Sequence, residues 1–408
     1  MSAHGYRIAW KERFCFSLFA ACHPVIRNAV TSPPFSRPNW AHIDLDALAH
    51  NARVLAANAA PARLICVIKA NAYGHGALPV ARALNDLPFV AMLAVASVDE
   101  GAQLRAEGIE KPILLLSALL REEAEAAAKA RLTPTIWTPE LAAAWSDATQ
   151  KVGRALPAHF KVDTGMARLG VHWCEAVARW RELQRFPDIE WRGVYTHLAC
   201  ADDEDDEMSA QQLERFARFL DEAEVGKNVL RHTGNSAAQL RYPMSHFDAV
   251  RPGLALYGAH PCADLCETKV ELKPVMTRLA RVTALRKVAA GEAVSYGATW
   301  RSPRPSRVAT VACGYADGYL RALGNRGEVL IDGARFPVVG RVTMDQILVD
   351  VTDSAQDVPL GAEVILWGAD LPVEEVATRA GTISYELLCA VSARVPRVYA
   401  SGVSSSGN

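Results

Sequence analysis

The feature that most constrains the fold of this 408-residue chain is an alternation of apolar segments of strand length with Ala-rich segments of helix length. The alternation begins near residue 40, and the apolar runs are Leu64–Ile68, Phe89–Val95, Ile113–Leu116, Thr133–Trp137, Ala158–Val162, Glu190–Thr196, Asn228–His232 and Phe247–Val250. Eight βα units in about 200 residues are typical of a (β/α)8 barrel, whereas a doubly wound sheet usually stops at five or six strands. We therefore predict an α/β fold that begins with a TIM barrel.

The segments between the apolar runs carry helix start signals. Helices are expected at residues 76–86, 98–107, 121–131, 139–149, 174–186 and 208–224. Ser97 and Glu100 have the spacing of a capping box, and Thr138 places a capping residue before a proline at the first helical position. In such a barrel, catalytic groups lie just after the carboxyl ends of the strands.

After about residue 271 the pattern changes to short segments rich in Val and Ile, separated by Gly, Pro and Asp. Strands are expected at Leu279–Leu285, Arg307–Val311, Gly327–Ile331, Phe336–Val339, Ile347–Val351 and Glu363–Leu366, with one helical passage near 373–380. Asp332 and Gly333 between two of these strands are a hairpin signal. We predict a barrel over residues 39–271 and a C-terminal, mainly-β domain over 272–400.

The two ends of the chain differ from these domains. Residues 1–38 contain a basic stretch, the short apolar segment Phe14–Cys22 and a Pro/Ser-rich passage. A signal peptide begins in this way, and export is one reading of the segment. Because Ser17 interrupts the apolar stretch and no cleavage site is convincing, we predict a disordered extension that packs on nothing. The Ser/Gly-rich tail 401–408 is also expected to be disordered.

Composition limits the classes of partner. The chain has 44 Lys plus Arg and 45 Asp plus Glu, so its net charge of −1 gives no basic field for nucleic acid or anionic lipid. No apolar run reaches the roughly 18 residues of a membrane-spanning helix. The nine cysteines include no C-x-x-C pair, which argues against a zinc ribbon and a disulfide framework. We expect a cytoplasmic protein with a small-molecule partner and without a metal, and we interpret the acidic run Asp202–Glu207 as a solvated loop before a helix.

Lys69 is the first candidate for chemistry. It follows the apolar run Leu64–Ile68 directly and precedes a Gly-rich turn. A partly buried lysine has a lowered pKa, and its neutral amine can form a Schiff base with an aldehyde. The same position suits a structural lysine whose ammonium reaches solvent from the strand end, so position alone leaves both readings open.

Other predicted barrel strands also end in polar groups, which are expected to converge on one face. Arg168 follows the strand at 158–162, His197 follows the strand at 190–196, and Arg251 follows the last strand. Taken alone, the position of His197 is typical of a buried core histidine, and that of Arg168 is typical of an arginine in a surface ion pair. The pair Asn235 and Ser236, with the turn before Gly253, can present hydroxyls and backbone amides to an anion.

Polar groups also interrupt the strands of the β half, at Tyr296 and at Met344. Taken alone, the position of Tyr296 is typical of a half-buried aromatic residue in a strand. Because the ordinary pKa of tyrosine is near 10, it must fall, or its proton must be relayed, before Tyr296 acts as a base near neutrality.

The segments that contain these residues resemble alanine racemase. They are Val67–Gly76, Lys161–Gly170, Arg251–Gly258, Val294–Gly297 and Met344–Gln346. The resemblance extends in order from about residue 38 to about residue 400. It implies an isomerase of fold type III that uses pyridoxal 5′-phosphate (PLP) on a (β/α)8 barrel, with a C-terminal β domain and a head-to-tail homodimer.

The resemblance implies two bases on opposite faces of alanine. Lys69 would hold PLP covalently and move the α-proton on the D face, and Tyr296 of the partner subunit would act on the L face. His197 matches the position thought to communicate with that tyrosine. Arg251 matches the arginine that faces the pyridine nitrogen, and its guanidinium can donate there without giving up a proton.

The same resemblance implies the remaining binding roles. Arg168 and the amide of Met344 would receive the substrate carboxylate, Lys161 matches a lysine that is carbamylated in many members and orients the arginine, and Tyr315 would line the entrance. The other cofactor-binding residues, most of them at the phosphate, would be Tyr73, Asn235, Ser236, Gly253, Leu254 and Tyr385. Leu254 replaces a commoner isoleucine, which should matter little if its amide is the working group.

The implied activity is interconversion of L-alanine and D-alanine, either to supply D-alanine for peptidoglycan or to catabolise it. Three alternatives share the cofactor. A racemase of broad specificity would admit longer side chains. A PLP-carrying homeostasis protein would need no second base such as Tyr296, and a fold-type III decarboxylase would release the carboxylate that Arg168 would hold here.

Overall fold

The computed structural model describes residues 37–203, 207–262, 265 and 270–400 of the chain. Residues 1–36 and 401–408, for which we predicted disorder, therefore lie outside the described residues. The middle of the acidic run, at 204–206, lies outside them too. Within the described part, no helix is both long and apolar enough to cross a membrane.

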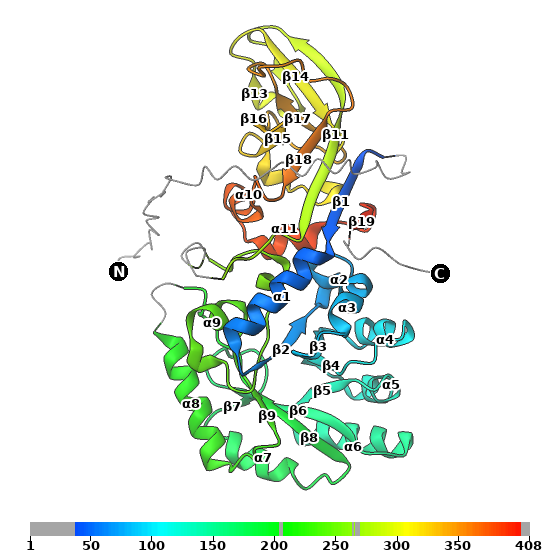
Figure 1. The fold of residues 1–408 in the computed structure, drawn as a ribbon, viewed down its shortest axis with the longest axis vertical. Helices are drawn as coiled ribbons and strands as arrows, with labels where there is room; N and C mark the ends of the chain where they lie inside the picture. Colours follow the sequence, from blue (N-terminus) through cyan, green and yellow to red (C-terminus); the bar gives the residue numbers. More distant parts are fainter. Residues whose placement is uncertain (1–36, 204–206, 263–264, 266–269, 401–408) are drawn as a thin grey trace, which may run out of the picture. The chain divides into compact units, whose positions relative to one another are not determined.

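The predicted barrel is confirmed. Its parallel strands follow the order β5-β4-β3-β2-β10-β9-β8-β6, and pairing of β5 with β6 closes the ring (Figure 1). The strands are β2 (Arg63–Val67), β3 (Val90–Val95), β4 (Ile113–Ala118), β5 (Thr133–Ile136), β6 (Leu156–Asp163), β8 (Ile189–Tyr195), β9 (Leu230–His232) and β10 (Ala249–Val250). A two-residue strand, β7 (Val171–His172), adds to β6 outside the ring. Each predicted apolar run overlaps one of the barrel strands, because parallel strands that are buried on both faces are apolar at nearly every position.

Helices surround this ring, as Figure 1 shows. They are α1 (Leu45–Ala59), α2 (Lys69–Tyr73), α3 (Ala77–Asn85), α4 (Val98–Ala106), α5 (Ala124–Lys129), α6 (Pro139–Val152), α7 (Ala176–Leu183), α8 (Met208–Glu222) and α9 (Ser236–Arg241). Both start signals are confirmed: Ser97 and Glu100 form a reciprocal capping box, and the Thr138 side chain accepts a hydrogen bond from the Leu141 amide. Short 3-10 turns lie at Arg121–Glu123, Pro243–Ser245 and Leu254–Tyr257.

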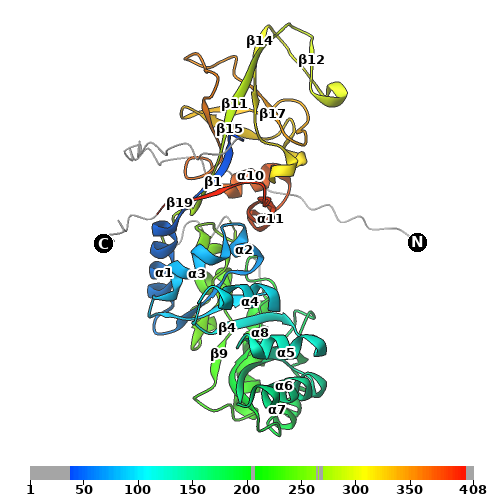
Figure 2. The same ribbon diagram turned by 90° about the vertical axis from the view of Figure 1, so that its right-hand side faces the viewer.

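The second half of the chain is mainly β, as predicted, and its central strand is β11 (Met276–Val288) (Figure 2). β11 pairs with β1, β14 and β18. The other strands are β12 (Ala293–Val294), β13 (Trp300–Arg301), β14 (Ser306–Val311), β15 (Glu328–Ile331), β16 (Ala334–Pro337), β17 (Ile347–Asp350), β18 (Glu363–Trp367) and β19 (Arg397–Ala400). The hairpin between β15 and β16 turns at Asp332 and Gly333, both with positive φ, as its sequence predicts.

Helix α10 (Val373–Ala380) is the predicted helical passage, and a second helix, α11 (Ser384–Ala390), was not predicted. Further 3-10 turns occur at Tyr296–Ala298, Tyr315–Asp317 and Arg321–Leu323. Cys66 and Cys313 are buried, whereas Cys174 and Cys389 are exposed.

Two details differ from the predicted organisation. Strand β1 (Asn39–Asp44), at the start of the segment assigned to the barrel, pairs with β11 and β19 of the β half instead. Arg37, assigned to an extension that packs on nothing, forms an ion pair with the buried Asp317. Local sequence could not show either detail, because both depend on partners more than 200 residues away in the chain.

Candidate active site

A cavity of about 510 Å³ lies where the barrel strands end. It is lined by Val67, Lys69, Ala70, Tyr73, Leu116, Ser117, Lys161, Arg168, Leu169, Tyr195, His197, Asn235, Ser236, Arg251, Gly253, Leu254, Tyr385 and Cys389. Eleven of these residues are candidates from the sequence, so the predicted convergence on one barrel face is present in the structure. Tyr385 and Cys389 come from α11, so the cavity draws on both halves of the chain.

Lys69 begins a turn of left-handed helix. The four residues after it, Ala70 to Tyr73, have φ between 50° and 54°, and Gly74 continues at φ 80°. This conformation costs roughly 1–2 kcal/mol per residue for side chains with a Cβ, so the surroundings must impose it. Backbone strain of this kind is concentrated at functional sites.

Glu100 is one of the groups that hold this turn. Its carboxylate accepts hydrogen bonds from the amides of Ala70 and Ala96, each at 2.7 Å, and from the amide of Ser97 at 3.3 Å. One carboxylate therefore joins the residue after Lys69 to the loop after β3. On the other side, a Cβ on Gly74 would lie 2.1 Å from the carbonyl oxygen of Leu388, so the turn packs directly on α11.

The cavity is cationic. Lys69, Lys161, Arg168 and Arg251 line it, and no Asp or Glu is among the described residues of its wall. Burial, with Arg168 nearby, lowers the pKa of Lys69. Burial, with Arg251 and Arg168 nearby, lowers the pKa of Lys161 to about 7. Such a site favours neutral amines and attracts anions.

Arg251 is held in one orientation by a dense set of acceptors. Its guanidinium donates to the carbonyl oxygens of Thr196, His232 and Thr233 at 2.8–2.9 Å. It also reaches Nδ1 of His232 at 2.7 Å and Nδ1 of His197 at 3.1 Å. Because a guanidinium only donates, each histidine accepts at Nδ1, and its ring proton lies on Nε2.

Burial, followed by the charge of Arg251, lowers the pKa of His197 well below its usual value. His197 is therefore a neutral imidazole whose Nε2–H is available as a donor. His232 donates its Nε2–H to Nδ1 of His159, at a distance of 2.9 Å.

Hydroxyl groups and backbone amides lie together at one part of the cavity wall. Ser236, at the start of α9, accepts hydrogen bonds at Oγ from the amides of Gly253 and Ala255. A Cβ on Gly253 would lie 2.5 Å from the hydroxyl of Tyr73, so only glycine permits this approach. The rings of Tyr73 and Tyr385 lie 6.0 Å apart. Asn235 caps α9 by accepting a hydrogen bond from the Ala238 amide.

Three predicted site residues do not line the cavity of their own chain. Tyr296, Tyr315 and Met344 belong to the β half and are 72%, 44% and 54% exposed. Tyr296 lies in a turn in which Ser295 and Ala298 have positive φ. Strain at a turn that exposes a tyrosine is consistent with a functional role for this side chain.

Seven residues of the cavity wall were not candidates from the sequence, and Tyr195 and Cys389 are two of them. The Tyr195 ring lies under the guanidinium of Arg251 and the amine of Lys161, at 5.0 and 5.3 Å, and its hydroxyl lies 2.8 Å from that of Thr135. Tyr195 precedes His197 by two residues, so strand alternation places both on one face and could have identified it. Cys389 was missed because α11 was not predicted.

Two family models match this chain, one over the barrel and one over the β half. The model of the alanine racemase N-terminal domain matches residues 43–261, and that of the alanine racemase C-terminal domain matches residues 275–399.

Similar proteins cover almost the whole described chain. The alanine racemase of Carboxydothermus hydrogenoformans is 43% identical over 369 residues, which are 89% of this chain and 100% of that protein. The crystal structure of biosynthetic alanine racemase from Pseudomonas aeruginosa has a TM-score of 0.81 and 41% identity, covering 90% of this chain and 100% of that one. Alanine racemase from Bartonella henselae with covalently bound pyridoxal phosphate has a TM-score of 0.82 and 33% identity, covering 89% of this chain and 99% of that one.

Proposed function

The chain belongs to the alanine racemase family, and we propose that it interconverts L-alanine and D-alanine with PLP bound in the Lys69 cavity. The observation that carries this proposal is the position of Lys69, at the wall of a cationic cavity that Ser236, Gly253 and Leu254 also line. The enzyme would either supply D-alanine for peptidoglycan or catabolise it.

The residues present fit the cofactor. Lys69 offers an amine with a lowered pKa to the aldehyde. Ser236, Gly253 and Leu254 line the cavity with Tyr73 and Tyr385, where hydroxyls and backbone amides suit a phosphate group. Arg251 would face the ring nitrogen, to which it donates without transferring its proton. When bound, the cofactor withdraws electrons from Cα of the amino acid and so acidifies the α-hydrogen.

Two bases would then move the α-proton. Inversion requires that a proton is removed from Cα on one face and that a proton is returned to Cα on the other face. We assign the L face to Tyr296 and the D face to Lys69. The lowered pKa of Lys69 favours the neutral amine that accepts a proton. The Nε2–H of His197 can donate to the Tyr296 oxygen and stabilise its deprotonated form.

The substrate carboxylate would bind Arg168 and the amide of Met344. Lys161 would support Arg168 after carbamylation, since a carbamate forms only from a neutral amine and the pKa of Lys161 is lowered to about 7. The carbamate would replace a cation beside Arg168 with an anion, which orients the guanidinium.

We further propose a head-to-tail homodimer. Tyr296, Tyr315 and Met344 are exposed and lie outside the cavity of their own chain, which supports their use by a second copy. Each active site would then combine Lys69 of one subunit with Tyr296 of the other. We also propose a cytoplasmic location, which the free thiols of Cys66, Cys174, Cys313 and Cys389 support.

Racemisation of a panel of amino acids in both directions tests this function. We expect alanine to be the preferred substrate, with D-alanine and L-alanine reaching equal amounts. In Tyr296→Phe, the primary isotope effect with α-deuterated L-alanine should increase more than that with α-deuterated D-alanine. Equal isotope effects in the two directions would contradict the assignment of Tyr296, and preferential turnover of longer side chains would favour a racemase of broad specificity.

A further inference from the structure

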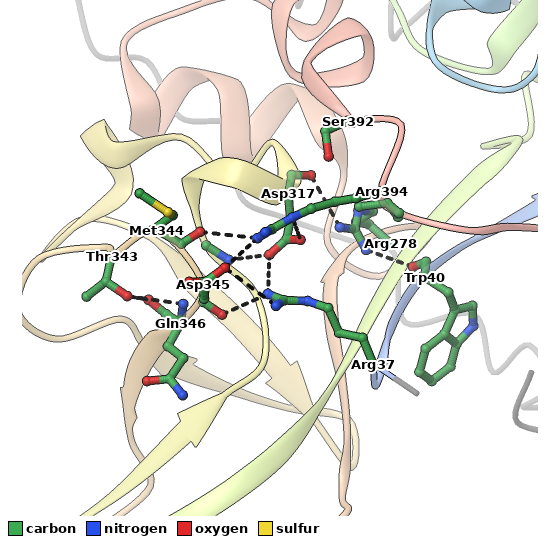
Figure 3. Close-up of polar contacts among 12 residues, drawn as sticks. Arg37, Trp40, Arg278, Asp317, Thr343, Met344, Asp345, Gln346, Ser392 and Arg394 are labelled. Carbon is green, nitrogen blue, oxygen red and sulfur yellow. Dashed lines mark hydrogen bonds and ion pairs between the residues drawn. The ribbon is translucent and has the colours of Figure 1, made fainter. Parts of the chain in front are cut away.

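A buried carboxylate organises the surface that carries Met344 and Tyr315. Asp317, at the end of the 3-10 turn Tyr315–Asp317, has 0% exposure in a half of the chain that is rich in arginine. Its carboxylate accepts from the Gly314 amide at 2.8 Å, from Arg37 at 2.7 Å and from Nε of Arg394 at 2.8 Å (Figure 3). We name Asp317, Arg37, Arg394 and Asp345 the Asp317 cluster.

The two arginines of the Asp317 cluster continue to the loop that contains Met344. Arg37 donates to the carbonyl oxygen of Asp345 at 3.0 Å. Arg394 donates to the Asp345 carboxylate at 2.8 Å and reaches the Met344 carbonyl oxygen at 3.4 Å. In Figure 3 both guanidinium groups lie between Asp317 and this loop. Each arginine therefore couples the position of the loop to the buried carboxylate.

Backbone contacts complete the connection. The amides of Tyr315 and Ala316 donate to the carbonyl oxygens of Thr343 and Met344, each at 3.0 Å. A Cβ on Gly314 would lie 2.3 Å from the Thr343 carbonyl oxygen, so the turn and the loop are in direct contact. The carbonyl oxygen of Met344 thus has partners within the chain, whereas among the described residues none accepts from its amide. That amide remains available to a ligand.

The same surface continues to Tyr296. The Ser295 hydroxyl donates to the Arg341 carbonyl oxygen at 2.8 Å, and a Cβ on Gly340 would lie 2.6 Å from Cβ of Ser295. The turn of Tyr296 is therefore next to the segment that leads to Met344. Tyr296, Tyr315 and Met344 lie on connected loops, and none of them lines the cavity of its own chain.

We propose that Asp317 is a positioning residue that acts through Arg37 and Arg394 to hold Met344 and Tyr315 in the form that completes the active site of a second copy of this chain. This inference rests on the proposed racemase function and on the shared site. It differs from a role in folding alone, because a residue that only stabilises its own subunit would change the amount of folded enzyme and not the KM of the partner's site.

Asp317→Asn is the first variant, because it keeps the size of the side chain and removes its charge. We expect a KM for alanine roughly ten-fold above wild type, with a smaller change in kcat, as for loss of a contact to a charged group. The matched control is Asp353→Asn, which breaks an ion pair with Arg304 in the same half, where both side chains are about half exposed or more. This control should keep the KM of wild type.

Hybrid dimers locate the effect. Differently tagged subunits are combined and the hybrids purified through both tags. In a hybrid of Asp317→Asn with Lys69→Ala, the only lysine at position 69 belongs to the Asp317→Asn subunit, and its partner supplies an intact Asp317 cluster. We expect this hybrid to have the KM of wild type. The hybrid of wild type with a Lys69→Ala, Asp317→Asn double variant should have the raised KM.

A raised KM in the first hybrid, or an unchanged KM in Asp317→Asn, would overturn the inference. If Asp317→Asn does not fold, Arg394→Gln takes its place in the same hybrids with the same expected result, because the Arg394 side chain is 39% exposed and tolerates replacement more readily. A wild-type holoenzyme that racemises no amino acid would contradict the proposed function instead. That failure is distinct, because it is measured before any variant is made.

Discussion

At the scale of single residues, the environment of each cation decides its chemistry. The candidates Lys69, Arg168 and Arg251 could be identified from the sequence because they follow apolar strands of a barrel. Their protonation could not be predicted from the sequence, because burial and neighbouring charges come from distant segments. Lys161 shows this most clearly: its pKa falls to about 7 because it is buried beside Arg251 and Arg168.

Lys161 predicts a pH dependence of stability. Its pKa in the folded protein lies below its value of about 10.4 in the unfolded chain, so between these values the unfolded chain binds more protons. The free energy of unfolding should therefore rise from pH 7 toward pH 10. Urea titrations of cofactor-free protein at pH 7 and pH 9, in CO₂-free buffer, should show a smaller rise for Lys161→Met. The exposed Lys227→Met serves as the control, and an equal rise in Lys161→Met and wild type would refute the prediction.

Glu100 predicts a second effect at this scale. In Glu100→Gln one acceptor oxygen becomes a donor, so at least one of the amides of Ala70, Ala96 and Ser97 loses its partner. We expect a loss of about 1–3 kcal/mol in the free energy of unfolding and a lower kcat, because the turn after Lys69 is less firmly held. Glu107→Gln, in which an exposed carboxylate is replaced, should change stability by less than about 0.5 kcal/mol. Equal stabilities of the two variants, measured by chemical denaturation, would argue against the role of Glu100.

At the scale of elements, the predictions succeeded where local pattern determines structure. The barrel strands, their helices and the Asp332–Gly333 hairpin follow from apolar runs, caps and turn residues. Strand β1 and helix α11 were not predicted, because each depends on packing against a distant partner. The left-handed turn Ala70–Tyr73 could not have been predicted either, since alanine favours right-handed helix and the conformation is imposed by Glu100 and α11.

The contact of that turn with α11 can be measured by two glycine substitutions. Gly74 and Gly381 have φ of 80° and 73°, but a Cβ on Gly74 would lie 2.1 Å from the Leu388 carbonyl oxygen, whereas a Cβ on Gly381 meets nothing within 4 Å. Gly74→Ala should therefore lower the melting temperature more than Gly381→Ala, because both introduce the same strain and only the first introduces a clash. Equal losses would indicate that the turn does not pack firmly on α11.

At the scale of the whole molecule, the proposed active site requires two copies of the chain. One copy brings Lys69, Arg168 and Arg251 to a cavity, while Tyr296 and Met344 lie exposed on the β half. The resemblance implied a shared site, whereas the composition of the N-terminal segment led to the prediction that Arg37 belongs to an extension without contacts. In the structure Arg37 belongs to the Asp317 cluster, an arrangement that depends on residues about 280 positions away.

Mixing two homodimers, each of which lacks one of the two bases, tests the shared site. Lys69→Ala and Tyr296→Phe subunits, exchanged and reassembled, form one intact site in each hybrid dimer, so racemisation of alanine should return in part. The proportion of hybrids is measured by native mass spectrometry. Proven hybrids without activity would show that Lys69 and Tyr296 do not combine across subunits.

Borohydride reduction tests most directly whether Lys69 carries PLP in an enzyme that racemises alanine. Treatment of the active holoenzyme with borohydride should fix the cofactor to the protein and abolish racemisation. Peptide mass spectrometry should then find the phosphopyridoxyl group on Lys69. A label on another lysine, or full activity after Lys69→Ala, would contradict the role proposed for Lys69.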